Sequence, residues 1–173
     1  MKQITTADPA LYVGTYAKYN SGSIAGQWLT LSDYADRDDF IAAAHAIHAD
    51  EADPEIMYQD FEGFPHCWYG ESSAPPEILW QWLELDEEAR EACAAYADNL
   101  GGEIDIEDFK QNYCGQWDSG ADYAENLAEE CGDIPKDFPS WILIDWEASW
   151  NCNLSHDYHT SDAPGGGVYI FRN

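Results

Sequence analysis

The sequence predicts an α+β fold, because segments with the alternation of β-strands stand beside segments with the period of amphipathic helices. Hydrophobic residues make up 45% of the 173 residues and aromatic residues 14%. This is enough apolar material to build packed cores, which disordered acidic chains lack. Segments rich in Gly and Pro divide the chain into three small modules, which we expect at residues 1–62, 63–102 and 103–173.

The first module combines strands with one helix. Turn residues at positions 20–22 separate two segments of strand-like alternation, so we expect a β-hairpin over residues 10–30. An alanine-rich run that follows two Asp residues predicts a short helix over residues 40–49. A third strand is predicted over residues 56–61.

The second module is predicted to be helical. Gly and Pro at several positions indicate a long loop over residues 63–76. The strongest helical stretch of the chain comes next. Asp86 is a suitable N-cap for a helix over residues 87–99, and Gly101-Gly102 would end that helix.

The third module, which we expect to be α+β, alternates helices and strands. Its predicted helices cover residues 104–111, 119–131 and part of 140–150, and its predicted strands cover residues 113–117, 153–160 and 168–172. The helix over 119–131 is the clearest of these, because its small and apolar residues fall on one stripe.

The chain is strongly acidic. It holds 34 Asp and Glu against 7 Lys and Arg, a formal net charge of −27, and more than half of this charge lies between residues 71 and 140. Self-repulsion of this size destabilises a compact state, so the charge has to serve another purpose. It also excludes nucleic acid and anionic membranes as partners of this surface, because both are bound through Lys and Arg.

Acidic residues recur once per turn along the helix predicted over 119–131. Asp118, Asp122, Glu125 and Glu129 follow one another at i, i+4, i+7 and i+11, and no Lys stands among them. Like charges at i, i+4 destabilise a helix by roughly 0.2–0.5 kcal/mol per pair. We interpret the stripe as a surface that presents negative charge; an ordinary solvated helix face is the alternative.

The amount of charge is comparable to that of duplex DNA. DNA carries one charge per roughly 1.7 Å of its axis, so 27 charges correspond to about 46 Å. A compact chain of this length is roughly 40 Å across. One helix does not match the phosphate spacing, because carboxylates one turn apart rise about 6 Å, against about 3.4 Å per phosphate. A DNA mimic would therefore spread its carboxylates over several elements.

Metal and catalytic sites are not evident in the sequence. His45 and His48 lack further ligands nearby, and Cys152, His156 and His159 lack the fourth ligand of a structural zinc site. No nucleophile elbow, P-loop or HExxH motif occurs, and we assign the 8 Trp residues to cores. We therefore predict no metal, no cofactor and no enzymatic activity.

The cysteine pattern and the absence of targeting segments predict a cytoplasmic location. The 5 cysteines are widely spaced and form no CxxC pair, which indicates reduced thiols. No apolar core of a signal peptide is present. No segment approaches the roughly 20 apolar residues that span a bilayer.

Several short motifs resemble those of the ArdA antirestriction proteins. They are Leu11-Tyr12-Val13, Lys18-Tyr19-Asn20-Ser21-Gly22, Gly26-Gln27-Trp28-Leu29, Asp60-Phe61-Glu62-Gly63-Phe64-Pro65, Asp122-Tyr123-Ala124 and Asn153-Leu154-Ser155. In this order they cover nearly the whole chain from about Ala10. The acidic helical middle of the chain fits the same resemblance.

The resemblance implies an elongated, three-module protein that mimics bent B-form DNA. Such proteins are carried on mobile genetic elements and bind the methyltransferase core of Type I restriction-modification enzymes. The resemblance also implies a homodimer with its contact in the C-terminal module. In that module this chain departs from the family pattern at Trp146, Trp150, His156, His159 and the glycine loop at 165–167.

The predicted functional site is a surface and not a pocket. Its candidate phosphate-mimicking residues are Glu84, Glu87, Glu88, Glu91, Asp98, Asp118, Asp122, Glu125, Glu129 and Glu130. Three alternatives stay open: an acidic protein of a halophile, an acidic carbohydrate-active enzyme that uses its Trp residues, and a cation buffer.

Overall fold

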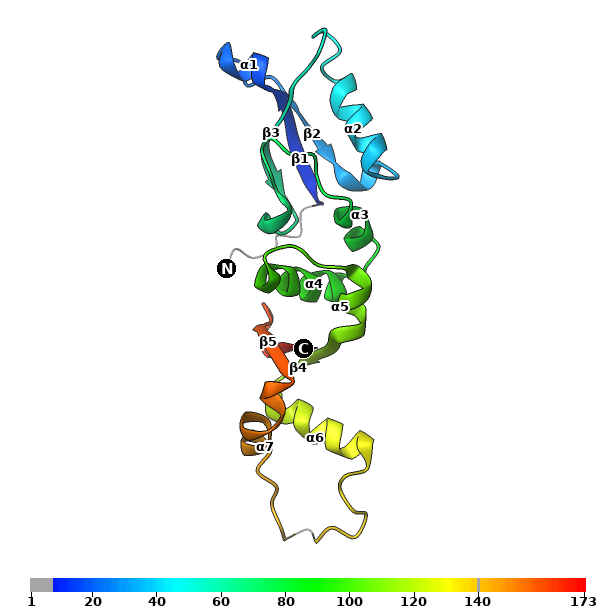
Figure 1. Ribbon diagram of the computed structural model, residues 1–173, viewed down its shortest axis with the longest axis vertical. Coiled ribbons are helices and arrows are strands. Elements are labelled where there is room, and N and C mark those ends of the chain that lie inside the picture. Colours follow the sequence, from blue (N-terminus) through cyan, green and yellow to red (C-terminus); the bar gives the residue numbers. More distant parts are fainter. Residues whose placement is uncertain (1–7, 140) are drawn as a thin grey trace. The chain divides into compact units, whose positions relative to one another are not determined.

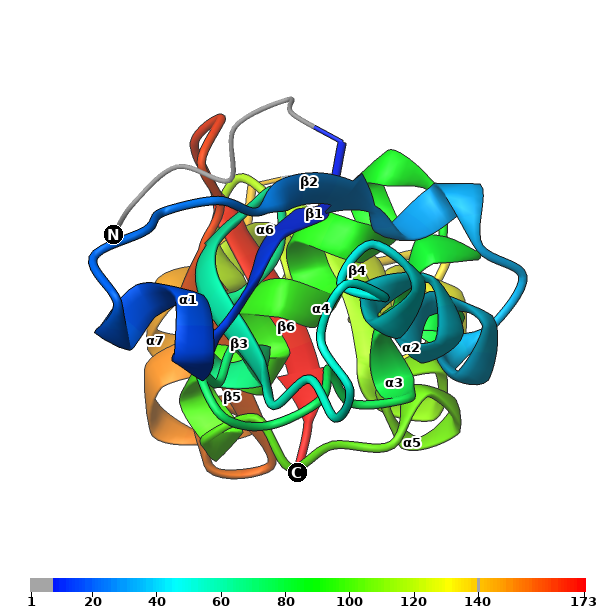
Figure 2. The same ribbon diagram turned by 90° about the horizontal axis from the view of Figure 1, so that it is seen from above.

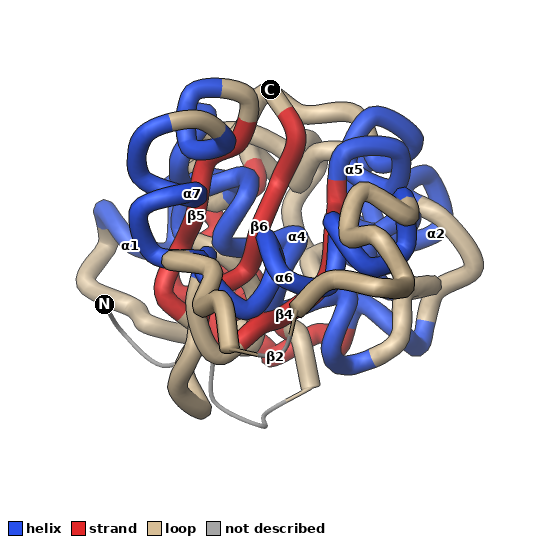
Figure 3. Tube along the Cα trace, turned by 90° about the horizontal axis from the view of Figure 1, so that it is seen from below, coloured by secondary structure: helices blue, strands red, loops and turns tan. Residues whose placement is uncertain are grey.

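The structure is a computed structural model that describes residues 8–139 and 141–173, and it confirms the α+β class (Figure 1). The chain divides into two compact units, residues 1–106 and 107–173. Each unit has one antiparallel sheet of three strands, and helices accompany strands in both (Figure 3). Within the described residues, no helix has both the length and the apolar character to cross a membrane. The division into three modules at residues 62 and 102 stays a prediction.

Unit 1 contains the sheet β2-β1-β3 and four α-helices among its described residues. Its elements are β1 (Ala10–Thr15), α1 (Tyr16–Asn20), β2 (Gln27–Thr30), the 3-10 helix η1 (Leu31–Asp33), α2 (Arg37–Ala46), β3 (Ile56–Glu62), the 3-10 helix η2 (His66–Trp68), α3 (Ile78–Leu83) and α4 (Glu87–Leu100). The third strand predicted in this region is confirmed, and it pairs with β1. Residues 1–7 of the predicted first module lie outside the described residues.

The predicted hairpin is confirmed as a pairing of strands but not as a continuous hairpin. Leu11 lies opposite Leu29 in the antiparallel β1–β2 pair. Along the chain, α1 comes between the two paired strands and continues directly from the end of β1 (Figure 2). Thr15 caps this helix, since its hydroxyl oxygen accepts the backbone N–H of Lys18 at 3.3 Å. The expectation that residues 24–26 belong to the strand was wrong, because β2 begins at residue 27.

The core of unit 1 is built where α2 packs on the sheet. Phe40 of α2 is completely buried and stacks on Tyr58 of β3 with 6.3 Å between ring centroids. The rings of Tyr34 and Trp80 meet Phe40 edge-on, at 5.4 and 5.9 Å. Aromatic packing therefore joins the helix α2, the sheet and α3 into one core.

The ends predicted for α4 are confirmed, whereas the helix predicted over residues 40–49 was wrong at both ends and runs from Arg37 to Ala46. Asp86 accepts the backbone N–H of Ala89 at 2.9 Å and so caps α4, and Gly101, at a φ of 73°, ends it in the left-handed conformation. In unit 2 Ser119 and Gly132 do the same for α6. Capping side chains satisfy amide groups that the helix itself leaves without partners, which is why sequence alone locates these ends.

Unit 2 contains the sheet β4-β6-β5, in which β6 is central. Its elements are α5 (Ile106–Asn112), which starts at the unit boundary, β4 (Tyr113–Trp117), α6 (Gly120–Cys131), α7 (Trp146–Cys152), the 3-10 helix η3 (Leu154–His156), β5 (Tyr158–Asp162) and β6 (Val168–Arg172). The strand predicted over 153–160 was partly wrong, because a 3-10 turn precedes β5. The helix predicted over part of residues 140–150 is confirmed as α7; residues 141–145 before it are a loop, and Ser140 lies outside the described residues.

Aromatic side chains also fill the core of unit 2. Tyr123 of α6 is buried between Trp117, Trp150 and Tyr158, with ring centroids 5.2–6.1 Å apart. The assignment of every Trp to a core was wrong at Trp28 and Trp141, which are 42% and 81% exposed. Trp141 belongs to the long loop between α6 and α7.

Candidate acidic interaction surface

The predicted acidic residues of unit 1 lie on and beside α4. Glu84 is the C-cap residue of α3, Glu87 and Glu88 form the first turn of α4, and Asp98 lies near its end. These four side chains are exposed, whereas Glu91 is half-buried. Small residues of α4 are buried on several sides. This helix therefore exposes less surface than we expect from its acidic residues.

Four of the five predicted acidic residues of unit 2 follow one line along α6, and Glu130 lies about 100° around the helix from Glu129. Asp118, which precedes the helix, and Asp122, Glu125, Glu129 and Glu130 on it are all exposed. The helix buries its opposite side through Tyr123 and Ala124. The stripe read from the period of the sequence is therefore a solvent-facing row of carboxylates on a rigid element.

The structure adds many acidic groups that the prediction did not select. All 34 Asp and Glu lie among the described residues, and all are exposed except Glu51 and Glu91. Asp33, Asp36 and Asp38 are examples, since they gather with their neighbours around the start of α2. A count of acids against bases would have found this cluster in the sequence, because residues 33–39 hold four Asp and only one Arg.

The arginines of unit 1 bind backbone oxygen atoms and so leave carboxylates unneutralised. Arg90 donates to the carbonyl oxygens of Leu83 and Leu85, at the C-terminal end of α3, and its guanidinium lies 5.7 Å from the centre of the Trp82 ring. Arg37 donates to the carbonyl oxygen of Pro75 at 2.8 Å. Carbonyls at the C-terminal end of a helix attract a cation, so Arg90 stabilises the end of α3, while Arg37 binds the loop that precedes this helix.

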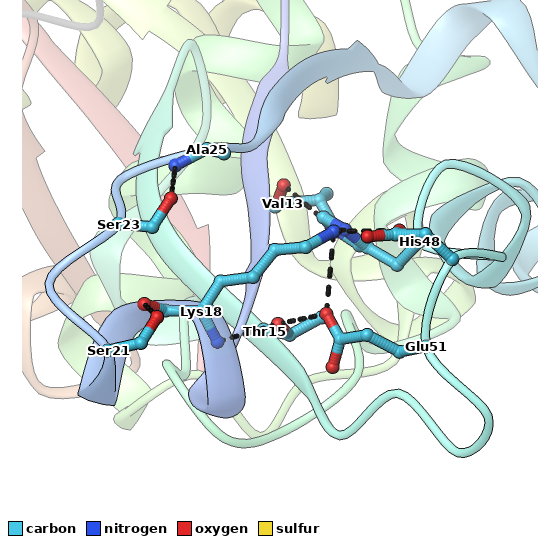
Figure 4. Close-up of polar contacts among 9 residues, drawn as sticks. Val13, Thr15, Lys18, Ser21, Ser23, Ala25, His48 and Glu51 are labelled. Carbon is cyan, nitrogen blue, oxygen red and sulfur yellow. Dashed lines mark hydrogen bonds and ion pairs between the residues drawn. The ribbon is translucent and has the colours of Figure 1, made fainter.

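Among the described residues of unit 1, Lys18 is the cation that pairs with carboxylates, at a partly exposed position (Figure 4). Its ammonium lies 2.9 Å from Asp50, 3.4 Å from Glu51 and 2.9 Å from Nδ1 of the buried His48. Hydrogen bonding to Asp50 raises the pKa of Lys18, and the same contact lowers the pKa of Asp50. This contact fastens α1 to the loop after α2.

Three residues of this cluster have side chains that could bind a metal ion, and they are the group of this kind found among the described residues. The ligand atoms of His48, Asp50 and Glu51 lie within 4.8 Å of one another. The ammonium of Lys18 contacts all three of them and takes the place that a cation would need. His45, paired with His48 in the sequence, is exposed on α2 and outside this group.

Two thiols of unit 1 should lower the stability of this unit at alkaline pH. Burial, together with the nearby Asp98, raises the pKa of Cys67 from 9.0 to about 11, and burial raises that of Cys93 to about 12. The folded state thus holds these protons more tightly than the unfolded chain. The resulting stabilisation is complete below pH 9.0 and is lost as the pH rises toward the folded-state values.

We expect the free energy of unfolding to fall by about 2 kcal/mol between about pH 8 and pH 10.5 through Cys93 alone. Urea denaturation followed by circular dichroism at each pH measures this. Cys93→Ala should flatten the pH dependence, and Cys131→Ala, at an exposed position, should leave it unchanged. An equally steep dependence in Cys93→Ala would contradict the assignment.

Comparison with known families identifies the family of the chain. The sequence profile of the antirestriction protein (ArdA) family matches residues 11–165 of the 173-residue chain. No curated protein sequence matches the chain. ArdA proteins are inhibitors that act on restriction-modification enzymes, and their motifs occur here from β1 to the loop before β6. The chain therefore belongs to the ArdA family of antirestriction proteins.

Proposed function

We propose that this protein is a DNA mimic that inhibits Type I restriction-modification enzymes in the cytoplasm. Its carboxylates take the place of phosphates in the basic channel of the methyltransferase core, and so block restriction and modification together. The site is the acidic surface of the two units, and no catalytic step is involved. Membership of an antirestriction family supports the target class.

The observation that carries this proposal is that the carboxylates are exposed while the arginines of unit 1 do not neutralise them. Every carboxylate except those of Glu51 and Glu91 is exposed, while Arg37 and Arg90 are turned to backbone carbonyls. The net charge of −27 equals that of roughly 13 base pairs of duplex DNA. Such a surface attracts a basic channel at long range and speeds encounter with it.

Binding to a purified methyltransferase core tests the proposal directly. We expect tight binding at about 50 mM salt that weakens steeply toward about 200 mM, because the contacts are mainly electrostatic. Circular dichroism should show the same folded chain throughout. A halophilic protein would instead unfold at low salt. No binding by a folded sample at low salt would count against mimicry of that enzyme's DNA.

We further propose that unit 2 forms the contact of a homodimer. The loop between α6 and α7 carries Trp141, Ile142 and Leu143, which are 81%, 39% and 91% exposed. Exposed apolar groups of this size mark contact surfaces. The expected occupant is the same loop region of a second copy, as the family resemblance implies.

Replacing Trp141 and Leu143 together by Ser should convert a dimer into a monomer. Light scattering after gel filtration should then give the 19.5 kDa of one chain instead of twice that mass. Ile24→Ser is the matched control, since Ile24 is 78% exposed in unit 1 and should leave the mass unchanged. A dimer that persists in the double variant would place the contact elsewhere.

A further inference from the structure

One row of side chains crosses the sheet of unit 1 on the face opposite the core. Tyr12 of β1 lies opposite Trp28 of β2 on one side and opposite Asp60 of β3 on the other. Residues directly opposite in antiparallel strands point to the same face of the sheet. The core residues Leu11 and Val13 flank Tyr12 in the chain and point the other way. We call Trp28, Tyr12 and Asp60 the aromatic–acidic row.

The aromatic part of this row is held in a fixed geometry. The rings of Tyr12 and Trp28 meet edge-to-face with 5.5 Å between their centroids. The Tyr12 hydroxyl donates to the carbonyl oxygen of Ile24 at 2.9 Å. Gly26 allows the approach, because a Cβ atom there would lie 2.9 Å from the edge of the Tyr12 ring. Trp28 nevertheless remains 42% exposed, so its ring is both positioned and accessible.

The acidic part of the row is equally well placed. Asp60 is exposed, and its Oδ1 accepts the backbone N–H of Phe61 at 2.9 Å, which orients the carboxylate. Glu62 lies two residues further along the same strand and is also exposed. The three strands contain no Lys, Arg or His. The face therefore offers aromatic rings and carboxylates to a partner, and no cation of its own strands competes for them.

We propose that the aromatic–acidic row is a docking site for an arginine side chain of the partner protein. A guanidinium stacks on aromatic rings and binds carboxylates through its planar set of N–H groups. An ammonium is more strongly hydrated and lacks the planar group, so lysine fits this row less well. A second copy of the chain is a poor occupant, because it would bring carboxylates against carboxylates.

This inference rests on the proposed function and extends it. The acidic helices would supply the salt-sensitive attraction that a mimic of phosphates needs. The row would add a contact in unit 1 that is specific for arginine and less screened by salt, because part of it is stacking and not charge pairing.

The first test uses small probes and does not require the restriction enzyme. Full-length protein labelled with ¹⁵N is titrated with N-acetyl-arginine amide and, at equal ionic strength, with N-acetyl-lysine amide. The indole N–H resonance of Trp28, assigned with Trp28→Phe, should shift more with the arginine probe. The backbone N–H resonance of Tyr19, an exposed aromatic residue outside the row and outside the proposed dimer contact, is the internal reference and should respond equally weakly to both probes.

Asp60→Asn is the matched variant, because its side-chain oxygen can still accept the N–H of Phe61 while the charge is gone. It should reduce the Trp28 shift by about half or more. Equal shifts of Trp28 and Tyr19, or equal shifts with both probes, would overturn the proposal. So would an unchanged response in a folded Asp60→Asn protein.

The second test uses the methyltransferase core of a Type I enzyme that the wild type binds. Trp28→Ala should weaken binding roughly 5- to 30-fold, and the loss should persist at about 200 mM salt. Trp28→Phe should keep most of the affinity, and Tyr19→Ala, at an exposed aromatic residue of α1, should keep all of it. Wild-type affinity in Trp28→Ala would overturn the inference. If the wild type itself does not bind the core, the proposed function fails while the arginine titration still decides the inference.

Discussion

Replacing Asp118, Glu125, Glu129 and Glu130 by their amides should weaken inhibition of a Type I restriction enzyme by roughly 10- to 100-fold. All four side chains are exposed: Asp118 precedes α6, Glu125 and Glu129 belong to its acidic stripe, and Glu130 lies beside that stripe. Each single replacement should change the inhibition constant by less than about fivefold, because an exposed charge contributes roughly 0.2–1 kcal/mol. Asp122 is left intact, since it contacts the hydroxyl of the cap residue Ser119. Inhibition constants from a DNA cleavage assay provide the measurement.

The same four replacements should leave the protein as stable as the wild type, or slightly more stable. They remove like-charge neighbours at i, i+4, which destabilise a helix by roughly 0.2–0.5 kcal/mol per pair. The control exchanges Asp118 for Glu and the three Glu for Asp, so that the charge is kept. It should inhibit nearly as well as the wild type. Full inhibition by the amide variant, or loss of all inhibition in one single variant, would contradict a distributed charge surface.

Gly167→Ala should destabilise unit 2 by about 2–4 kcal/mol. Gly167 stands just before β6 with a φ of 77°, a conformation that L-residues with a side chain adopt at a cost. A Cβ atom there would also clash with the backbone carbonyl oxygen of Trp117, the last residue of β4. Relief of that clash requires β4 and β6 to separate, and β6 is the central strand of the sheet.

Gly166→Ala is the matched control for this prediction. Its φ is 100°, but a Cβ atom there would meet nothing within 4 Å. The cost should therefore be confined to the backbone strain of about 1–2 kcal/mol. Hydrogen exchange measured by mass spectrometry should show faster exchange in β4 and β6 for Gly167→Ala than for Gly166→Ala. Exchange in β1 and β3 serves as the internal reference; equal rates in both variants would exclude the clash.

The parts of the fold that depend on near neighbours in the chain were predictable. Asp86, Ser119 and the glycines that end α4 and α6 act through hydrogen bonds and backbone conformations within a few residues. The pairing of β3 with β1, and of β6 with β4, joins segments far apart in sequence. No local pattern specifies such partners. The helix α1 was missed because turn residues and strand-like alternation surround a helix of one turn.

In the candidate surface, too, features that depend on near neighbours in the chain were predictable, and features that depend on tertiary packing were not. The α6 stripe followed from helical period alone, because one side of this helix packs and the other does not. Glu91 was misjudged as an open site, because tertiary packing surrounds more of α4 than its sequence indicates. The role of Arg90 as a ligand of carbonyl oxygens required coordinates. So did the exposure of Trp28 and Trp141, since a Trp that contacts a partner looks like a core Trp in sequence.

The most direct test of the central claim is DNA cleavage by a purified Type I restriction enzyme, with and without this protein, at several DNA concentrations. A DNA mimic competes for the DNA channel, so inhibition should be strong at low DNA and should be relieved as the DNA concentration rises. Methylation by the same enzyme should be inhibited with the same dependence on DNA. Inhibition that added DNA does not relieve, or full cleavage in the presence of folded protein at both low and moderate salt, would contradict mimicry of DNA.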